Sequence, residues 1–370
     1  MSERKKHLSG VRTLVVKLGT QLLTDAHGRL DAPFLADIAG QIVALRSRGL
    51  SVTVVSSGAI GAGIHELDLP CRPKDLARLQ AVAAVGQRRL MDAWAEAFAP
   101  HKVPVAQLLL TREDIDNRKR FLNLRNTLNA IHEFHAVPII NENDSVSTDE
   151  IIRISFGDND ILAALVAHAF ESDLLVLLSV VDGLLDAAGQ PVRLVTSIEQ
   201  VRQLVRQEKS ALGRGGMDSK LQAAAMVTRG GQAMVVADGR PPRVLQRLLD
   251  GEEVGTLFVP SKKPRSGRKG WIGVVRPAGT IVVDDGAAAA LSQRNKSLLP
   301  AGVVAVEGDF DRGDVVHIKD QKGRIIARGL SNYPAQRIEQ IRGRKSAEVR
   351  AMLGDEAYEE IVHRNNLILE

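Results

Sequence analysis

Two short clusters of amide and carboxylate side chains could bind a charged ligand. Residues 141–144 (Asn-Glu-Asn-Asp) follow an apolar stretch, and residues 157–160 (Gly-Asp-Asn-Asp) precede an apolar helical pattern. Alternating amide and acid groups suit an ammonium group and a magnesium ion, which takes oxygen ligands. The first cluster could instead be a solvated turn, and the second a helix cap whose acids complement the helix dipole. Because both stand at the ends of predicted sheet elements, a shared binding site is the favoured interpretation.

A second set of residues could bind phosphate. Residues 212–220 (LGRGGMDSK) place glycines before a helical pattern and Lys220 in its first turn, an arrangement typical of an anion-binding helix start. Lys17 stands near the end of an apolar stretch beside Gly19, where a lysine either faces a ligand or extends its charge to the surface. The stretch 55–63 (VSSGAIGAG) lets backbone N–H groups approach an anion, although close helix packing requires the same small residues.

Several other functional classes lack their motifs in this chain. It has no P-loop motif G-x-x-x-x-G-K-[S/T], no G-x-G-x-x-G after the first apolar stretch and no protein-kinase signature. The nine histidines show no metal-site or triad spacing. The single cysteine, Cys71, excludes an intrachain disulfide and leaves no thiol pair for zinc. A nicotinamide cofactor and a zinc centre are therefore disfavoured.

Length and composition indicate a soluble globular protein. The chain has 370 residues, of which 44% are hydrophobic and 25% charged, with a mean hydropathy of −0.05. This length exceeds one ordinary domain of about 100–200 residues, so two domains are expected. No apolar run reaches the roughly 18 residues that a membrane helix needs, and no secretory pattern follows the basic start. We therefore expect a cytoplasmic protein that does not enter a membrane.

Strand and helix patterns alternate along the first 260 residues, which predicts a mostly parallel sheet with helices on both faces. In such sheets ligands bind at the carboxyl ends of the strands. The predicted strands are rich in Val, Ile and Leu, as strands covered on both faces are, and span residues 13–18, 52–55, 103–110, 137–140, 174–178 and 233–237. The predicted helices span residues 33–48, 75–99, 118–135, 159–170, 198–207 and 218–229.

The rest of the chain has a different organisation. Residues 261–276 hold six basic residues and no acidic one, so the charge of this segment alone exceeds the net charge of +5 of the whole chain. Such a charged segment between two balanced regions predicts a linker. Residues 277–355 alternate short β-rich stretches with Gly/Asp turns and one Ala-rich helix, a pattern typical of a small barrel. The predicted organisation is a catalytic domain over 10–260, a basic linker over 261–276, a β-rich domain over 277–355 and a tail over 356–370.

The motifs in this order resemble the amino acid kinase family. They are 16–20 (VKLGT), 57–60 (SGAI), 84–87 (AVGQ), 109–112 (LLTR), 120–123 (RFLN), 141–144, 157–160 and 215–220 (GGMDSK). More narrowly, they resemble the branch that phosphorylates glutamate in the first step of proline synthesis. Residues 279–287 (GTIVVDDGA) and 297–302 (SLLPAG) resemble a PUA domain. The resemblance implies a three-layer αβα sandwich followed by a small β-rich PUA-like barrel.

The resemblance also implies a reaction and its participants. ATP would transfer its γ-phosphoryl group to the side-chain carboxylate of L-glutamate, with Mg²⁺ held mainly by the ATP phosphates rather than by the protein. Proline would be a feedback inhibitor, and the chain would form a homo-oligomer, either a dimer or a tetramer. A carboxylate nucleophile, with a pKa of about 4.3, is already ionised at neutral pH and needs no general base. Catalysis would then rest on positioning and positive charge.

Roles follow from the resemblance residue by residue. The catalytic positions are Lys17, Lys220, Asp158 and Asp160. The glutamate-binding positions are Ser57, Gly58, Ala59, Asn141, Asn143, Asp144 and Asn159. The ATP-binding positions are Lys17, Gly19, Ser179, Val180, Arg214, Gly215, Gly216, Met217, Asp218, Ser219 and Lys220.

One position departs from the family pattern. Where the family usually has Thr-Asp after a strand, this chain has Ser179 and Val180, and Leu185 replaces an aromatic residue nearby. Valine cannot supply the hydrogen bonds of an acid, so the departure bears on nucleotide affinity. Two alternative functions stay open: a family member with another acidic substrate, and RNA binding through the PUA-like domain. The net charge of −1 over 277–370 argues against RNA binding, which needs clustered bases.

Overall fold

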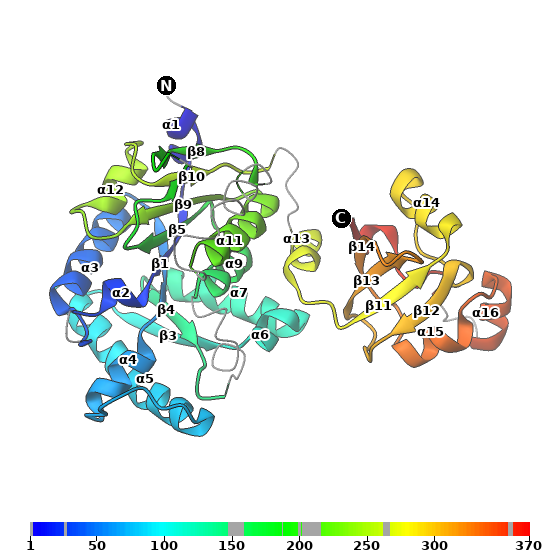
Figure 1. Cartoon of the computed structure of the whole chain (residues 1–370), viewed down its shortest axis with the longest axis horizontal. Helices are drawn as coiled ribbons and strands as arrows, with labels where there is room; N and C mark the ends of the chain where they lie inside the picture. The colour runs from blue at the N-terminus through cyan, green and yellow to red at the C-terminus, as the bar shows by residue number, and fades with distance from the viewer. Residues whose placement is uncertain are drawn as a thin grey trace. The chain divides into compact units, whose positions relative to one another are not determined.

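The computed structural model divides the chain into two compact units, Met1–Pro264 and Arg265–Glu370 (Figure 1). It describes residues 3–25, 28–146, 159–186, 188–198, 201, 216–261, 267–353 and 358–370. In that part of the chain, no helix is long and apolar enough to cross a membrane. Each unit has its own sheet and its own buried core, and each is described below by itself.

The first unit is built on an eight-stranded sheet whose neighbouring strands are parallel, except that β10 runs antiparallel to β9. In sheet order the strands are β3 (Val105–Leu110), β4 (Val137–Glu142), β2 (Ser51–Ser56), β1 (Thr13–Leu18), β5 (Leu174–Ser179), β9 (Ala233–Asp238), β10 (Thr256–Phe258) and β8 (Leu194–Val195). The central strands β1, β2 and β5 are buried along almost their whole length, because helices cover both faces. The predicted α/β fold class is confirmed.

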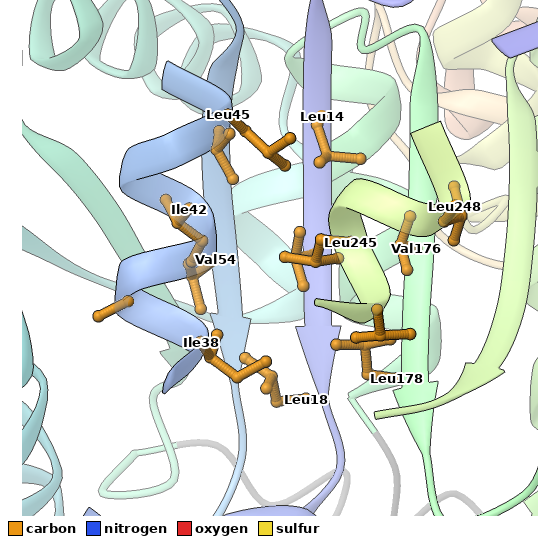
Figure 2. Packing of buried hydrophobic residues seen from close by; sticks show 14 of the residues in the cluster. Leu14, Leu18, Ile38, Ile42, Leu45, Val54, Val176, Leu178, Leu245 and Leu248 are labelled. Carbon is orange, nitrogen blue, oxygen red and sulfur yellow. The ribbon is translucent and has the colours of Figure 1, made fainter. Parts of the chain in front are cut away.

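One face of the sheet packs against α3 (Ala32–Ser47), α5 (Leu76–Phe98) and α12 (Val244–Leu249). Figure 2 shows α3 and α12 on the same side of β2, β1 and β5, with their leucines and isoleucines inserted toward the strands. Successive strand side chains point to opposite faces, so Leu14, Val16 and Leu18 of β1 enter this core. Val15 and Lys17 therefore point to the other face.

The other face is covered by α7 (Arg118–Glu133), α9 (Asp160–Ala169) and α11 (Gly216–Gly230). The helix α9 is buried on nearly all sides, because it lies between the strands β1 and β5 and the helices α7 and α11. An all-round apolar helix can be stable only in such a position. Lys17 thus points toward the layer that contains α9.

Most predicted elements of the first unit match observed ones to within a few residues. The predicted helix over 198–207 lies largely outside the described residues. Several short elements were not predicted: α1 (Glu3–Leu8), α2 (Thr20–Leu23), α4 (Ala59–Glu66), α6 (Arg112–Asp116), α12, β6 (Leu184–Leu185), β7 (Pro191–Val192), β8 and β10. Elements of two to eight residues are too short for a hydrophobic period to be recognised, and tertiary packing decides them.

The second unit is a five-stranded sheet with short helices around it. In sheet order its strands are β12 (Val303–Glu307), β11 (Gly279–Val283), β13 (Val315–Asp320), β14 (Ile325–Leu330) and β15 (Leu367–Leu369). Its helices of seven residues or more are α13 (Gly267–Val274), α14 (Asp285–Arg294), α15 (Ala335–Ile341) and α16 (Ser346–Leu353). The core contains Ile281, Ile318 and Ile338 at full burial. The predicted β-rich character of this domain is confirmed.

The structure differs from the expected linker and tail. Within 261–276, residues 267–274 form α13, whose Trp271 and Ile272 are buried and which contacts β14 and β15. The net charge of the segment does not reveal that these two apolar residues lie on one buried face of a short helix. Within 356–370, Ile361 and Val362 are buried and β15 pairs antiparallel with β14. Much of both ranges therefore belongs to the folded second unit.

Close packing between α4 and α5 explains two glycines of the first unit. A Cβ atom on Gly86 of α5 would overlap the carbonyl oxygen of Ala59, and one on Gly63 of α4 would overlap the carbonyl oxygen of Val82. Gly61 lies in the same short helix but has open space beside it. The glycines at 63 and 86 thus let two helices approach, whereas Gly61 is free of this constraint.

We predict different effects on stability for two Gly-to-Ala substitutions. Gly86→Ala should lower the free energy of unfolding by about 2–3 kcal/mol, because a backbone carbonyl must move. Gly61→Ala is the matched control and should leave it unchanged or raise it by up to about 1 kcal/mol, because alanine favours helix. Chemical denaturation of the purified variants measures both values. Equal effects of the two substitutions would contradict the packing argument.

Candidate active site

The carboxyl ends of the parallel strands bring the predicted site residues to one edge of the sheet. Lys17 of β1 pairs in register with Val55 of β2 and Leu177 of β5, and Ser179 of β5 pairs with Asp238 of β9. The loops after β2 and β4 hold Ser57 and Asp144 at the same edge. Residues distant in the sequence are therefore neighbours here, as the parallel topology predicts.

A single carboxylate connects two buried lysines. The Oδ1 atom of Asp160 lies 2.8 Å from the Nζ of Lys17, and its Oδ2 atom lies 3.1 Å from the Nζ of Lys220. The hydroxyl of Ser219 donates to the same Oδ2 at 2.9 Å. Exposed fractions are 2% for the Lys17 side chain, 6% for that of Lys220 and 0% for that of Asp160. Three of the four predicted catalytic residues, Lys17, Lys220 and Asp160, thus meet in one cluster.

Three different elements supply this cluster. Lys17 points from β1 toward α9, Asp160 is the first residue of α9, and Lys220 is the fifth residue of α11, which packs against α9. The N-terminus of a helix favours an acidic side chain, so Asp160 suits the start of α9. Lys17 of β1 and Lys220 of α11 meet because both contact Asp160 at the start of α9.

The cluster combines two ammonium groups with one carboxylate. Burial by itself would raise the pKa of Asp160, but the adjacent ammonium groups of Lys17 and Lys220 outweigh it and hold the pKa below its ordinary value. The carboxylate is therefore ionised at neutral pH. Two buried ammonium groups at one place suit an anion such as a phosphate group.

The loop after β2 offers groups for a second anion. Gly58 has a φ of 102°, a left-handed conformation that favours glycine, and it caps the start of α4. The hydroxyl of Ser57 is buried and has no hydrogen-bond partner among the described residues. Ala59 is buried as the first residue of α4. A hydroxyl and a helix start at one place suit a carboxylate ligand.

A chain of side-chain amides lies next to that loop. The Nδ2 of Asn159 donates to the carbonyl oxygen of Ser56 at 3.1 Å and to the Oδ1 of Asn141 at 2.7 Å. The Nδ2 of Asn141 donates to the Oε1 of Gln87 at 2.8 Å. The Oδ1 of Asn159 is buried and has no partner among the described residues. This orphaned acceptor is a feature that a donor on a ligand would satisfy.

The other predicted residues of the β4 loop lie close by in the chain. Asn143 and Asp144 are half-buried, and the backbone N–H of Asn143 donates to the carbonyl of Leu110 at 2.8 Å. Burial raises the pKa of Asp144 to about 7, and the charge of Glu142 adds to this, while Arg72 opposes it. A buried acid with a raised pKa is poised to gain from a cationic ligand.

The predicted nucleotide loop follows β5. The carbonyl of Ser179 accepts a hydrogen bond from the N–H of Gly239 at 2.9 Å, and Val180 is half-buried against the core. The apolar side chain at position 180 is thus stabilised by packing rather than by hydrogen bonds. Of the residues at the start of α11, Met217 is half-buried and Asp218 is exposed. A Cβ atom on Gly19 would contact the Nζ of Lys17 and the carbonyl of Leu178.

Three predicted site residues, Asp158, Arg214 and Gly215, lie outside the described residues. Gly216 starts α11, and its burial is not described. Their assigned roles stay predictions. The prediction gave no role to Gln87 or to Trp94, whose indole N–H donates to the hydroxyl of Ser56 at 3.0 Å. A signal for Gln87 was present: it is a polar residue in the apolar stripe of α5. A buried amide at such a position needs a partner.

A protein-held metal is not supported by the described side chains. Among them, no group of three or more His, Cys, Asp or Glu residues could hold a metal ion. Both oxygens of Asp160 already contact Lys17, Lys220 or Ser219. How the enzyme holds a magnesium ion stays a prediction.

Comparison with known proteins identifies the families of the two domains. The model of the Amino acid kinase family matches residues 12–238, and that of the PUA domain matches residues 279–353. The chain belongs to the amino acid kinase family. The resemblance drawn from the motifs is confirmed for both domains. As a kinase of this family, the protein is an enzyme that uses ATP.

Relatives named glutamate 5-kinase match nearly the whole chain. The relative from Citrifermentans bemidjiense is 44% identical over 99% of this chain and 100% of its own length. That from Geobacter sulfurreducens is 45% identical over 98% of both chains, and that from Pseudomonas aeruginosa is 46% identical over 98% of this chain and 99% of its own. A solved carbamate kinase from Giardia has a similar fold, with 16% identity and a TM-score of 0.50 over 68% of this chain and 100% of that chain.

We predict that Asp160→Asn strongly destabilises the protein. The substitution keeps the size of the side chain but removes the carboxylate that two buried ammonium groups share, which should lower the free energy of unfolding by about 3–5 kcal/mol. Asp250→Asn is the matched control, because Asp250 forms an ion pair with Arg48 at the surface. Its effect should stay below about 1 kcal/mol. Similar small effects in denaturant titrations would show that the buried cluster is not held by Asp160.

Proposed function

We propose that this enzyme transfers the γ-phosphoryl group of ATP to the side-chain carboxylate of L-glutamate, giving L-glutamyl 5-phosphate and ADP. The observation that carries the proposal is the position of the buried Lys17–Asp160–Lys220 cluster beside a separate set of unsatisfied groups on Ser57 and Asn159. The first suits a phosphoryl group, and the second suits an amino acid. The names of the full-length relatives support the same substrates.

The phosphoryl transfer needs positive charge rather than a base. The attacking carboxylate is ionised at neutral pH, so its main obstacle is repulsion by the phosphate chain. Lys17 and Lys220 would neutralise the charge that develops on the transferring and leaving oxygens, while Asp160 holds both ammonium groups in place. Asp158, Gly215 and Gly216 would add further contacts. Mg²⁺, bound to the phosphates, would supply additional charge neutralisation.

The amino acid end of glutamate matches the second set of groups. The NH₂ group of Asn159 is already used, because it donates to Ser56 and to Asn141. The remaining polar atom, Oδ1, is an acceptor and needs a donor from the substrate. The α-ammonium is the only hydrogen-bond donor that glutamate offers at neutral pH, so we place it at this oxygen and near Asp144. The α-carboxylate would bind the hydroxyl of Ser57 and the loop N–H groups at Gly58 and Ala59.

Further assignments rest on the family resemblance and are part of the proposal. They comprise a catalytic region over residues 10–260, nucleotide contacts at Gly19, Ser179, Val180 and residues 214–219, proline as a feedback inhibitor, a homo-oligomeric state, and a cytoplasmic place in proline synthesis. No observation on the second unit favours the alternative of RNA binding, since residues 277–370 carry a net charge of −1.

The direct test is an ADP-release assay with single amino acids. Glutamate should support Mg²⁺-dependent turnover at least about a hundredfold better than aspartate, because a chain shorter by one methylene misplaces the carboxylate by about 1 Å or more. Omission of Mg²⁺ and omission of the amino acid are the controls. Equal rates with aspartate, or no turnover with glutamate, would overturn the proposal.

Glutamate binding should strengthen as pH rises through about 7. The pKa of Asp144 is raised to about 7 by burial, so in the free enzyme it is largely protonated at pH 6 and ionised at pH 8. Only the ionised form attracts the α-ammonium, so affinity should increase over this range. Calorimetric titration with glutamate at several pH values measures the trend. In Asp144→Asn the trend should disappear; its persistence would assign it to another group.

A further inference from the structure

Gln87 is a polar side chain in a stripe of otherwise apolar residues. The buried face of α5 also includes Val82, Leu90 and Trp94, and Gln87 itself is only 8% exposed. A buried amide destabilises a core unless its hydrogen bonds are made. The partner of Gln87 is Asn141, a predicted substrate residue at the end of β4. The position of this glutamine therefore relates to the site rather than to the packing of α5.

The direction of each hydrogen bond in the amide chain follows from one backbone group. The carbonyl oxygen of Ser56 can only accept, so the atom of Asn159 that faces it at 3.1 Å is the NH₂ group. The atom of Asn141 that faces this NH₂ at 2.7 Å is then its oxygen. The NH₂ group of Asn141 must point the other way, where it meets the oxygen of Gln87 at 2.8 Å.

Gln87 closes this chain from the opposite helical layer. Asn141 follows Val137 and Ile139 on the face of β4 that packs with α5, whereas Asn159 starts α9 on the other face of the sheet. The amides thus pass around the end of the sheet from α5 to α9. If the oxygen of Gln87 were absent, the buried NH₂ group of Asn141 would lose its acceptor, and Asn141 would no longer be held in the position from which it accepts from Asn159. The side chain of Asn159 would then be held through Ser56 alone.

We propose that Gln87 is a positioning residue for recognition of the substrate's α-ammonium. Its oxygen holds Asn141, Asn141 holds Asn159, and the Oδ1 of Asn159 is thereby presented as an acceptor. This arrangement selects an amino dicarboxylic acid over the dicarboxylic acid of the same length without the amine. The inference rests on the proposed function, because it takes glutamate as the ligand, and Gln87 itself does not touch the substrate.

The test compares glutamate with glutarate, which lacks the amine, in the full-length enzyme. In Gln87→Met, which keeps the length but removes the acceptor, the KM for glutamate should rise about tenfold, the effect of losing one oriented hydrogen bond. The kcat and the KM for ATP should stay within about twofold, because Lys17 and Lys220 are untouched. The inhibition constant of glutarate should be unchanged, since glutarate has no ammonium group.

Two further variants separate positioning from stability. Gln87→Glu keeps an oxygen that accepts from Asn141 and should restore the KM for glutamate to within about threefold of wild type. Gln41→Met is the matched control, because Gln41 is also buried and its oxygen accepts from the N–H of Leu245 at 3.0 Å, within the α3–α12 layer. It should reduce stability but leave the KM for glutamate unchanged.

The outcomes distinguish this inference from the proposed function. If wild-type enzyme releases ADP with glutamate but Gln87→Met has a normal KM, the positioning role is wrong and the function stands. If Gln87→Met weakens glutamate and glutarate equally, Gln87 acts through general packing, which also overturns the inference. If wild-type enzyme does not act on glutamate at all, the proposed function fails first. Calorimetric binding of glutamate without ATP gives a readout independent of turnover.

Discussion

The shared carboxylate of Asp160 is the interaction on which the site depends. Two lysines in the interior repel each other and would be unstable there without a common counter-charge. Asp160 supplies it from the start of α9 and contacts both lysines. The same contact joins β1, α9 and α11, so the geometry of the anion site and the packing of three elements are decided together.

The layered fold explains how the two halves of the site stay separate. Alternation along β1 sends Leu14 and Leu18 into the core with α3 and α12 (Figure 2). It leaves Lys17 facing α9 on the other side of the sheet. The anion site is therefore built on one face of the sheet. The amide chain of Asn159, Asn141 and Gln87 instead passes around the strand ends. A phosphoryl donor and an amino acid can thus bind at the same edge of the sheet through different protein groups.

Two of the buried polar atoms that lack a hydrogen-bond partner among the described residues lie at the candidate site. The side chains of Gln41 and Thr53 are buried with hydrogen-bond partners, in line with ordinary cores. Ser57 Oγ and Asn159 Oδ1 lack partners among the described residues. The position of the unsatisfied groups, at the carboxyl edge and next to the lysine cluster, is what connects the structure to an amino acid substrate.

The sheet layers could be predicted from the amino-acid sequence, and so could the residues that line the carboxyl edge of the sheet. Apolar runs and helical periods placed β1, β2, β4, β5 and β9, and the motifs after them named Lys17, Asp144, Asn159 and Lys220. This succeeds because period and turn chemistry are local properties of the chain. The short elements, the helix within 267–274 and the pairing of β15 were decided by tertiary contacts that no local pattern records. Gln87 belongs to the same class: only the fold brings it within 2.8 Å of a residue 54 positions away.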